Sequence, residues 1–193
     1  MAPTRTWTPA NVVTMARIAV VPVFGWALAN AADDAVGWRL AATGLFVIAA
    51  LTDRLDGYLA RSRGQITALG VVLDPIADKL LIGTALVLLS AQDRVAWWMT
   101  LVILAREVGI TVWRFALLRS RIVPASRGGK LKTVVQSVAI GLCLLPLTHL
   151  PAWVEITAVV AVWLAVVITV VTGVDYLARG LRARSVVRET APA

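Results

Sequence analysis

Eight residues between positions 53 and 78 carry charged or unusually small side chains at regular intervals: four carboxylates, one guanidinium and three glycine or alanine positions. In chain order they are Asp53, Asp56, Gly57, Ala60, Arg61, Gly70, Asp74 and Asp78. The surrounding segments are apolar enough to lie in a lipid bilayer, where each aspartate costs roughly 2.5 to 3.5 kcal/mol even on the mildest insertion scale. These charges need cations, partners or water, so the run is the candidate active site.

Helical spacing would place this run on two helix faces. Its first five residues stand at i, i+3, i+4, i+7 and i+8, and its last three at i, i+4 and i+8, which are the offsets of one face of a helix. Two helices can therefore present paired carboxylates to each other. Pro75 leaves two alternatives open: Asp74 caps the start of a helix, or a kinked continuous helix points both aspartates inward.

The carboxylates predict a divalent metal site. Four of them close together would repel one another unless cations neutralise them. Oxygen ligands suit Mg²⁺ or Mn²⁺, and two such ions about 4 Å apart recur where a phosphoryl group is attacked. Gly57 and Ala60 leave room for a base or a diphosphate near the helix backbone, and Arg61 can pair with phosphate oxygens. The chemistry predicted is phosphoryl transfer with two metal ions.

The elements that must position this run are membrane helices. The chain has 193 residues, of which 59% are hydrophobic, and its mean hydropathy is +0.81, whereas ordinary soluble domains are about 45 to 50% apolar. A span needs about 20 mostly apolar residues. We place six spans, at 11–30, 36–60, 68–90, 95–118, 131–149 and 153–178, all helical because lipid requires internally satisfied backbone. The prediction is a single all-α integral membrane domain over residues 1–193.

The first span has an alternative interpretation. Ala27, Leu28 and Ala29 follow an apolar run and resemble the cleavage site of a removable signal peptide. The apolar run extends back to Val12, however, with Arg17 inside it, and this length favours a retained first helix.

Basic residues mark one side of the membrane. The net charge is +8, and the pI is near 11.0. The cations gather beside span ends, at Arg5, Arg61, Arg63, Arg119, Arg121, Arg127, Lys130, Lys132, Arg179, Arg182, Arg184 and Arg188. By the positive-inside rule both termini and the 61–67 and 119–132 loops are cytoplasmic. Such loops orient helices and attract anionic lipid headgroups, so we expect no nucleic-acid partner.

Charged residues also occur in the first and fourth spans. Arg106 and Arg114 lie on one face of the fourth span, and together with Lys130 and Lys132 they form a candidate site for an acceptor phosphate. The alternative is that Glu107 forms an internal ion pair with one of these cations. Similarly, Arg17 either reaches the donor phosphate or extends to the membrane interface.

The aspartate run resembles, without gap or substitution, the signature of the CDP-alcohol phosphotransferases, integral membrane enzymes of phospholipid synthesis. Residues 11–17, 73–79, 106–107 and 129–133 resemble the phosphatidylglycerophosphate synthase branch of that family. These flanking segments also fit cardiolipin and phosphatidylinositol-phosphate synthases to varying degrees.

The resemblance implies a six-helix fold, a homodimer, and a metal site that opens to the cytoplasmic side of the cell membrane. It implies that Asp53, Asp56 and Asp74 are metal ligands, that Asp78 is both ligand and general base, and that Gly57, Arg61 and Thr67 contact the CDP part of the donor. The implied reaction transfers a phosphatidyl group from CDP-diacylglycerol to sn-glycerol 3-phosphate and releases CMP. Inositol phosphate and phosphatidylglycerol are alternative acceptors.

A divalent-cation transporter is the rival function from another class, because intramembrane carboxylates also line ion paths. Two features disfavour it. The carboxylates gather at one membrane face, and Arg61 would repel a permeating cation.

Overall fold

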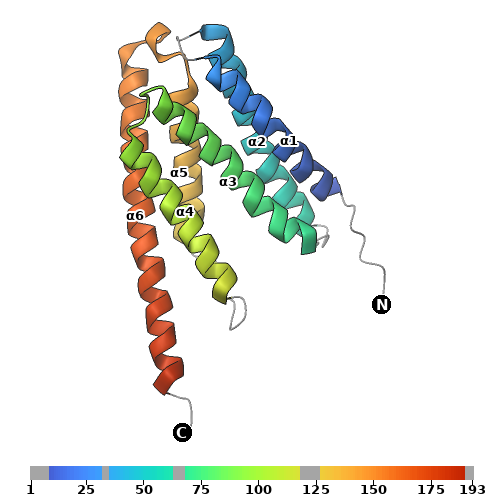
Figure 1. Ribbon diagram of the computed structural model, residues 1–193, viewed down its shortest axis with the longest axis vertical. Coiled ribbons are helices and arrows are strands. Elements are labelled where there is room, and N and C mark those ends of the chain that lie inside the picture. Colours follow the sequence, from blue (N-terminus) through green and yellow to red (C-terminus); the bar gives the residue numbers. More distant parts are fainter. Residues whose placement is uncertain (1–8, 32–34, 63–67, 118–126, 190–193) are drawn as a thin grey trace.

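The chain folds into a bundle of long helices (Figure 1). The structure, a computed structural model, describes the backbone of residues 9–31, 35–62, 68–117 and 127–189, and the side chains of residues 11–31, 35–52, 73–112 and 132–178. Within these ranges there is no strand, and the helices are α1 (Pro9–Ala29), α2 (Val36–Ser62), α3 (Ala68–Ala91), α4 (Trp97–Leu117), α5 (Arg127–Leu144), the short η1 (Leu147–His149) and α6 (Ala152–Glu189). The predicted all-α fold is confirmed.

Two helices differ from the predicted spans by more than two residues at one end or both. The fifth span was placed at 131–149, but α5 begins at Arg127 and ends at Leu144, because Pro146 cannot continue a helix. The sixth helix continues past residue 178 to Glu189 and is 38 residues long. At about 1.5 Å per residue it is longer than the ~30 Å hydrocarbon layer, so apolarity marks where the span ends but not where the helix ends.

The helices run lengthwise, and their connections define two ends of the bundle. The α3–α4 turn and the α5–α6 turn lie together at one end (Figure 1), which we call the turn end. The start of α3, with Asp74 and Asp78, lies at the other, the aspartate end. Helix α1 packs on α2 and α3, while α6 packs on α5 and α4.

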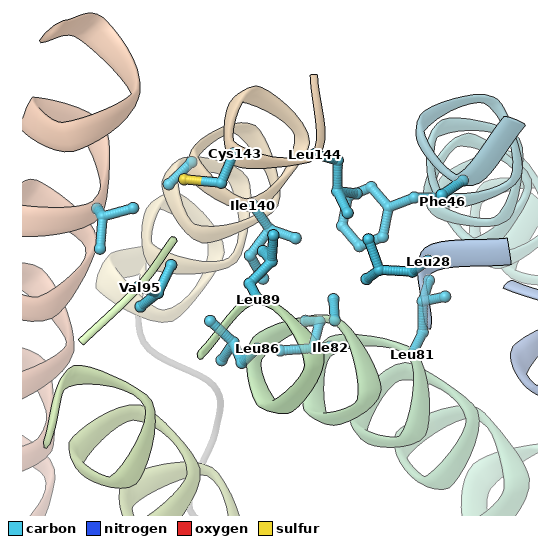
Figure 2. Packing of buried hydrophobic residues seen from close by; sticks show 14 of the residues in the cluster. Leu28, Phe46, Leu81, Ile82, Leu86, Leu89, Val95, Ile140, Cys143 and Leu144 are labelled. Carbon is cyan, nitrogen blue, oxygen red and sulfur yellow. The ribbon is translucent and has the colours of Figure 1, made fainter. Parts of the chain in front are cut away.

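The buried core changes character along the bundle. Toward the turn end it is mostly apolar: the Phe24 and Phe46 rings lie 6.0 Å apart, and Leu89 of α3 and Ile140 of α5 belong to the same cluster (Figure 2). Three buried polar residues, Arg39, Ser90 and Thr100, also lie at this end. Toward the aspartate end the buried side chains are polar, namely Asn11, Thr14, Arg17, Lys132, Gln136 and Thr169. Polar groups inside a bundle mark a functional site more often than a structural one in a membrane protein.

The outer surface is apolar, as a lipid-facing surface must be. Along α6, Trp153, Ile156 and Val171 are exposed by 66%, 63% and 61%. In the described part of the chain, residues 11–29 and 152–178 are long and apolar enough to cross a membrane, and residues 36–52 and 132–144 form shorter apolar helical segments.

Candidate active site

Helices α2 and α3 bring the aspartate run to one end of the bundle. The backbone of α2 is helical through Ser62, so the predicted helical spacing of Asp53, Asp56 and Arg61 is present there. Their side chains, like those of Gly57 and Ala60, lie outside the described residues, and so does all of Thr67. The side chains of Asp74 and Asp78 are described, and the site is built from them.

Asp74 and Asp78 belong to one uninterrupted helix. Pro75 lies inside α3, which begins at Ala68, so Asp74 is not the cap of a helix start, and the continuous-helix alternative is correct. Four residues apart, the two carboxylates stand one turn apart on the same face. The Asp74 side chain is exposed and that of Asp78 is half-buried, so both carboxylates are accessible.

A threonine of α1 orients Asp74. The Thr14 hydroxyl donates a hydrogen bond of 2.6 Å to Asp74 Oδ1, and Thr14 itself is buried. This bond holds one carboxylate oxygen and leaves the other available, an arrangement typical of groups that orient a metal ligand from behind. The sequence analysis missed Thr14, because its partner is sixty residues away in the chain.

Arg17 lies one helical turn beyond Thr14 on α1. Its side chain is only 4% exposed, so it does not extend to the membrane interface, and that alternative is wrong. A buried guanidinium on the turn next to the Thr14–Asp74 pair is suited to a phosphate close to the carboxylates.

A second polar cluster joins α4, α5 and α6. Glu107 Oε1 accepts a 3.2 Å hydrogen bond from Arg106 Nη1 and forms an ion pair with the buried Lys132 ammonium. Arg106 Nη2 also donates to the Thr172 hydroxyl at 3.4 Å. The internal ion pair that we considered for Glu107 is therefore present, and it includes two cations.

Gly173 lets Arg106 lie against α6. A Cβ atom at this position would come within 3.2 Å of Arg106 Cγ, which is closer than nearly all real contacts of that kind. The absence of a side chain there leaves room for the arginine stem, a role that was not evident in the sequence.

The two clusters face each other across the bundle. Lys132 lies within electrostatic range of Asp78 and Lys79 of α3 as well as of Arg106. The structure thus brings together the carboxylates of α3 and the cations of α4 and α5. Arg114 and Lys130, the other two predicted acceptor cations, lie on α4 and α5, but their side chains are outside the described residues.

Gln136 and Thr169 extend this polar region deeper into the bundle. Gln136 is 1% exposed and Thr169 is fully buried. Within the described chain, the side-chain amide nitrogen and oxygen of Gln136 have no hydrogen-bond partner, and neither does the Thr169 hydroxyl. Buried polar atoms of this kind are rare in proteins unless water or a ligand satisfies them. The only indication of these two residues in the sequence was that each is a polar residue within an apolar stripe, on α5 and on α6.

The donor atoms suit a hard divalent cation. Asp74 and Asp78 supply carboxylate oxygens on one helix face, and Thr14 supports one of them from behind. Among the side chains that the structure describes, no three His, Cys, Asp or Glu residues form a metal-binding group. The other two predicted ligands, Asp53 and Asp56, have side chains outside that part of the chain.

Comparison with known proteins assigns the family. The sequence model of the CDP-alcohol phosphatidyltransferases matches residues 7–171. The chain belongs to this family. It is therefore a membrane-bound CDP-alcohol phosphatidyltransferase, an enzyme of phospholipid biosynthesis, and its family is metal-dependent in general, as the resemblance of the aspartate run implied.

Individual relatives carry names from one branch of the CDP-alcohol phosphatidyltransferases. The chain is 48% identical over 182 residues to a probable phosphatidylglycerophosphate synthase of Mycobacterium tuberculosis, covering 94% of this chain and 86% of the relative. It is 37% identical over 188 residues to a CDP-diacylglycerol–glycerol-3-phosphate 3-phosphatidyltransferase of Bacillus subtilis, covering 90% and 95%. A Rickettsia felis protein of the same name is 38% identical over 168 residues, covering 86% and 91%.

Proposed function

We propose that this phosphatidyltransferase uses CDP-diacylglycerol as donor and sn-glycerol 3-phosphate as acceptor, giving phosphatidylglycerophosphate and CMP. The observation that carries the proposal is the buried Lys132 ammonium, which forms an ion pair with Glu107, the partner of Arg106, and is close enough to Asp78 to interact with its charge. If Lys132 and Arg106 held the phosphate of glycerol 3-phosphate, the attacking hydroxyl of the same molecule would lie toward the carboxylates of α3. The names of the relatives favour the same acceptor.

The donor would bind at the aspartate face. Asp53, Asp56, Asp74 and Asp78 would hold Mg²⁺ or Mn²⁺, with two ions expected, and bound metal lowers the negative charge of the diphosphate and stabilises departing CMP. Gly57 and Ala60 would let the donor approach the α2 backbone, and Arg61, Thr67 and Arg17 would contact its cytidine and phosphate groups. Thr14 would keep Asp74 oriented.

The transfer itself is a substitution at phosphorus. The acceptor hydroxyl oxygen forms a bond to the phosphatidyl phosphorus, the bond from that phosphorus to the CMP oxygen breaks, and CMP leaves. Asp78 accepts the hydroxyl proton. If Asp78 also held the metal it would be a weak base, so proton removal would accompany attack and would not precede it.

Binding of the acceptor phosphate requires several cations. Arg106, Arg114, Lys130 and Lys132 are the group we assign to it. Glu107 would keep Arg106 and Lys132 in place before the acceptor arrives, since a buried guanidinium or ammonium needs a counter-charge. Acceptor phosphate would then share the two cations with Glu107.

The protein would lie in the cell membrane with its aspartate end on the cytoplasmic side. The basic residues flanking that end support this orientation through the positive-inside rule. The transporter alternative has less support, because the apolar core of Leu86, Leu89 and Ile140 lies between the two ends of the bundle, and an ion path would need polar groups there.

The direct test is CMP release from CDP-diacylglycerol by the purified protein with Mg²⁺. Separate reactions receive glycerol 3-phosphate, inositol phosphate or phosphatidylglycerol. We expect release with glycerol 3-phosphate only. Release with another acceptor instead would reassign the substrate, and no release with all three, together with metal uptake into sealed vesicles, would favour the transporter.

A further inference from the structure

A cavity at the turn end lies far along the bundle from the aspartates and has no part in the reaction. Its volume is about 380 Å³, within the range of ligand-binding pockets, and its lining comes from the α3–α4 turn, the end of α5, the α5–α6 turn and the first two turns of α6. The lining residues are Asp93, Arg94, Cys143, Leu147, Thr148, Glu155, Ala158 and Val159.

The turn that carries Asp93 and Arg94 is rigidly built. Asp93 has φ of 55°, and the amide of Arg94 donates to the Leu89 carbonyl at 2.9 Å, which is the pattern of a Schellman helix end. The preceding Gln92 accepts a 2.7 Å hydrogen bond from Arg39 and donates one of 2.7 Å to the Leu28 carbonyl. These bonds fasten the turn to α1 and α2, so the cavity wall is preorganised.

The charges of the cavity favour a zwitterionic ligand. Two carboxylates, Asp93 and Glu155, and one guanidinium, Arg94, line it, so an anionic group meets only one cation there. Neither carboxylate has an ion-pair partner among the described residues. A molecule with a primary ammonium and a phosphate would place opposite charges against both kinds of side chain.

The apolar wall continues onto the lipid-facing surface. Val159 lines the cavity and is itself 51% exposed. One helical turn further along α6, Trp163 packs against Trp98 of α4 with ring centroids 5.4 Å apart, and both rings are about half exposed. Acyl chains that leave the cavity would therefore meet exposed apolar side chains of α4 and α6, including these two tryptophans.

We propose that this cavity binds the headgroup of an aminophospholipid such as phosphatidylethanolamine, with its ammonium between Asp93 and Glu155, its phosphate against Arg94, and its chains along α6. The bound lipid would belong to the membrane leaflet at the turn end, opposite the leaflet at which the active site opens. The inference depends on the membrane location of the family and not on the acceptor proposed above, so either proposal can fail without the other.

The test compares two lipids with identical acyl chains on the delipidated full-length protein in detergent. Phosphatidylethanolamine or phosphatidylglycerol is added, and binding is followed by native mass spectrometry and by the unfolding temperature. We expect tighter binding and greater stabilisation with phosphatidylethanolamine. Equal binding of the two lipids, or tighter binding of phosphatidylglycerol, would overturn the proposal.

Charge-neutral variants locate the site. Glu155→Gln and Asp93→Asn should each weaken phosphatidylethanolamine binding by about two- to fivefold, the size expected for one partly exposed ion pair. Asp175→Asn, at the other end of α6, serves as the matched control and should bind like the unaltered protein. Unchanged lipid preference in the Glu155→Gln, Asp93→Asn double variant would contradict the assignment, and CMP release by that variant would show that it is folded.

Discussion

At the scale of single residues, the carboxylates of α3 differ in what supports them. Asp74 is held from behind by Thr14 at 2.6 Å, whereas Asp78 lies in the field of the buried Lys132 ammonium. These surroundings agree with the two roles assigned, a metal ligand for Asp74 and a proton acceptor beside the bound acceptor for Asp78.

Asp78→Asn should lower kcat by at least about a hundredfold, because an amide cannot accept the hydroxyl proton and general-base catalysis contributes typically 10²- to 10⁴-fold. Binding of CDP-diacylglycerol should be largely retained, since the other three aspartates remain. The comparison is of kcat from CMP release and of donor affinity by titration. Substantial remaining turnover would show that another group takes the proton.

Thr14→Val should raise the Mg²⁺ concentration needed for half-maximal activity by about ten- to a hundredfold, the usual effect of removing a group that orients a metal ligand. Thr14→Ser keeps the hydroxyl and should restore the metal requirement. Thr43→Val is a matched control, because the Thr43 hydroxyl bonds only to the Arg39 carbonyl of its own helix. An unchanged metal requirement in Thr14→Val would show that the Thr14–Asp74 hydrogen bond does not contribute to metal binding.

At the scale of elements, α5 carries one buried stripe with two kinds of polar residue. Lys132 is bound to Glu107 of α4, while one turn further on the side-chain amide of Gln136 has no hydrogen-bond partner among the described residues. The same helix face thus contributes a cation to the proposed acceptor site and an unsatisfied amide beneath it.

Lys132→Met should raise KM for glycerol 3-phosphate by about ten- to a hundredfold, since a charge-assisted hydrogen bond contributes roughly 1.5 to 3 kcal/mol. Glu107 would keep Arg106 as a partner, so the helices should still pack. Steady-state kinetics with varied acceptor and saturating donor measure this effect. A fall in kcat with unchanged KM would contradict the role of Lys132 in acceptor binding.

Gln136→Met should leave the unfolding temperature unchanged or raise it. Replacing an unsatisfied buried amide by an apolar group of similar shape removes a desolvation penalty of about 1 to 3 kcal/mol. Thermal unfolding in detergent, with and without glycerol 3-phosphate, checks this expectation. A clear loss of stability without acceptor would mean that the amide has a partner in the folded protein.

At the scale of the whole molecule, most of the buried polar side chains lie toward the aspartate end, and many large apolar side chains are exposed along the helices. Buried charges at the aspartate end and exposed residues such as Trp153 and Ile156 along α6 reverse the pattern of a soluble helical bundle. This reversal is what a protein needs when its catalytic groups must be shielded from lipid and its surface must contact lipid.

The orientation of the bundle predicts the side on which each end lies. A fluorescent protein fused after Ala193 should fluoresce, because that side is cytoplasmic by the positive-inside rule. Alkaline phosphatase fused after Gln92, in the α3–α4 turn, should be active, because that turn is on the opposite side. A non-fluorescent fusion after Ala193 together with an inactive phosphatase fusion after Gln92 would show the opposite membrane topology. The active site would then be on the other side of the membrane.

Much of the fold and half of the site could be predicted from local pattern. Apolar lengths locate the six helices, and the spacing of Asp74 and Asp78 puts them on one helix face whatever the helix packs against. Helix ends were predicted less well: α6 continues in charged sequence to Glu189, because a helix outside lipid does not need apolar residues.

The partners of the charged groups depend on packing between helices that are distant in the chain. Glu107 could have paired with several cations: Arg106 is its neighbour on α4, and the assembled bundle adds Lys132 of α5. Nothing in the sequence indicated a role for Thr14, and two positions were open for Arg17, whereas the packing of α1 against α3 buries both side chains and pairs Thr14 with Asp74. Spacing along one helix is a local property of the backbone, whereas the facing of two helices is a property of the assembled bundle, so the residues of the aspartate face were evident in the chain and their partners only in the fold.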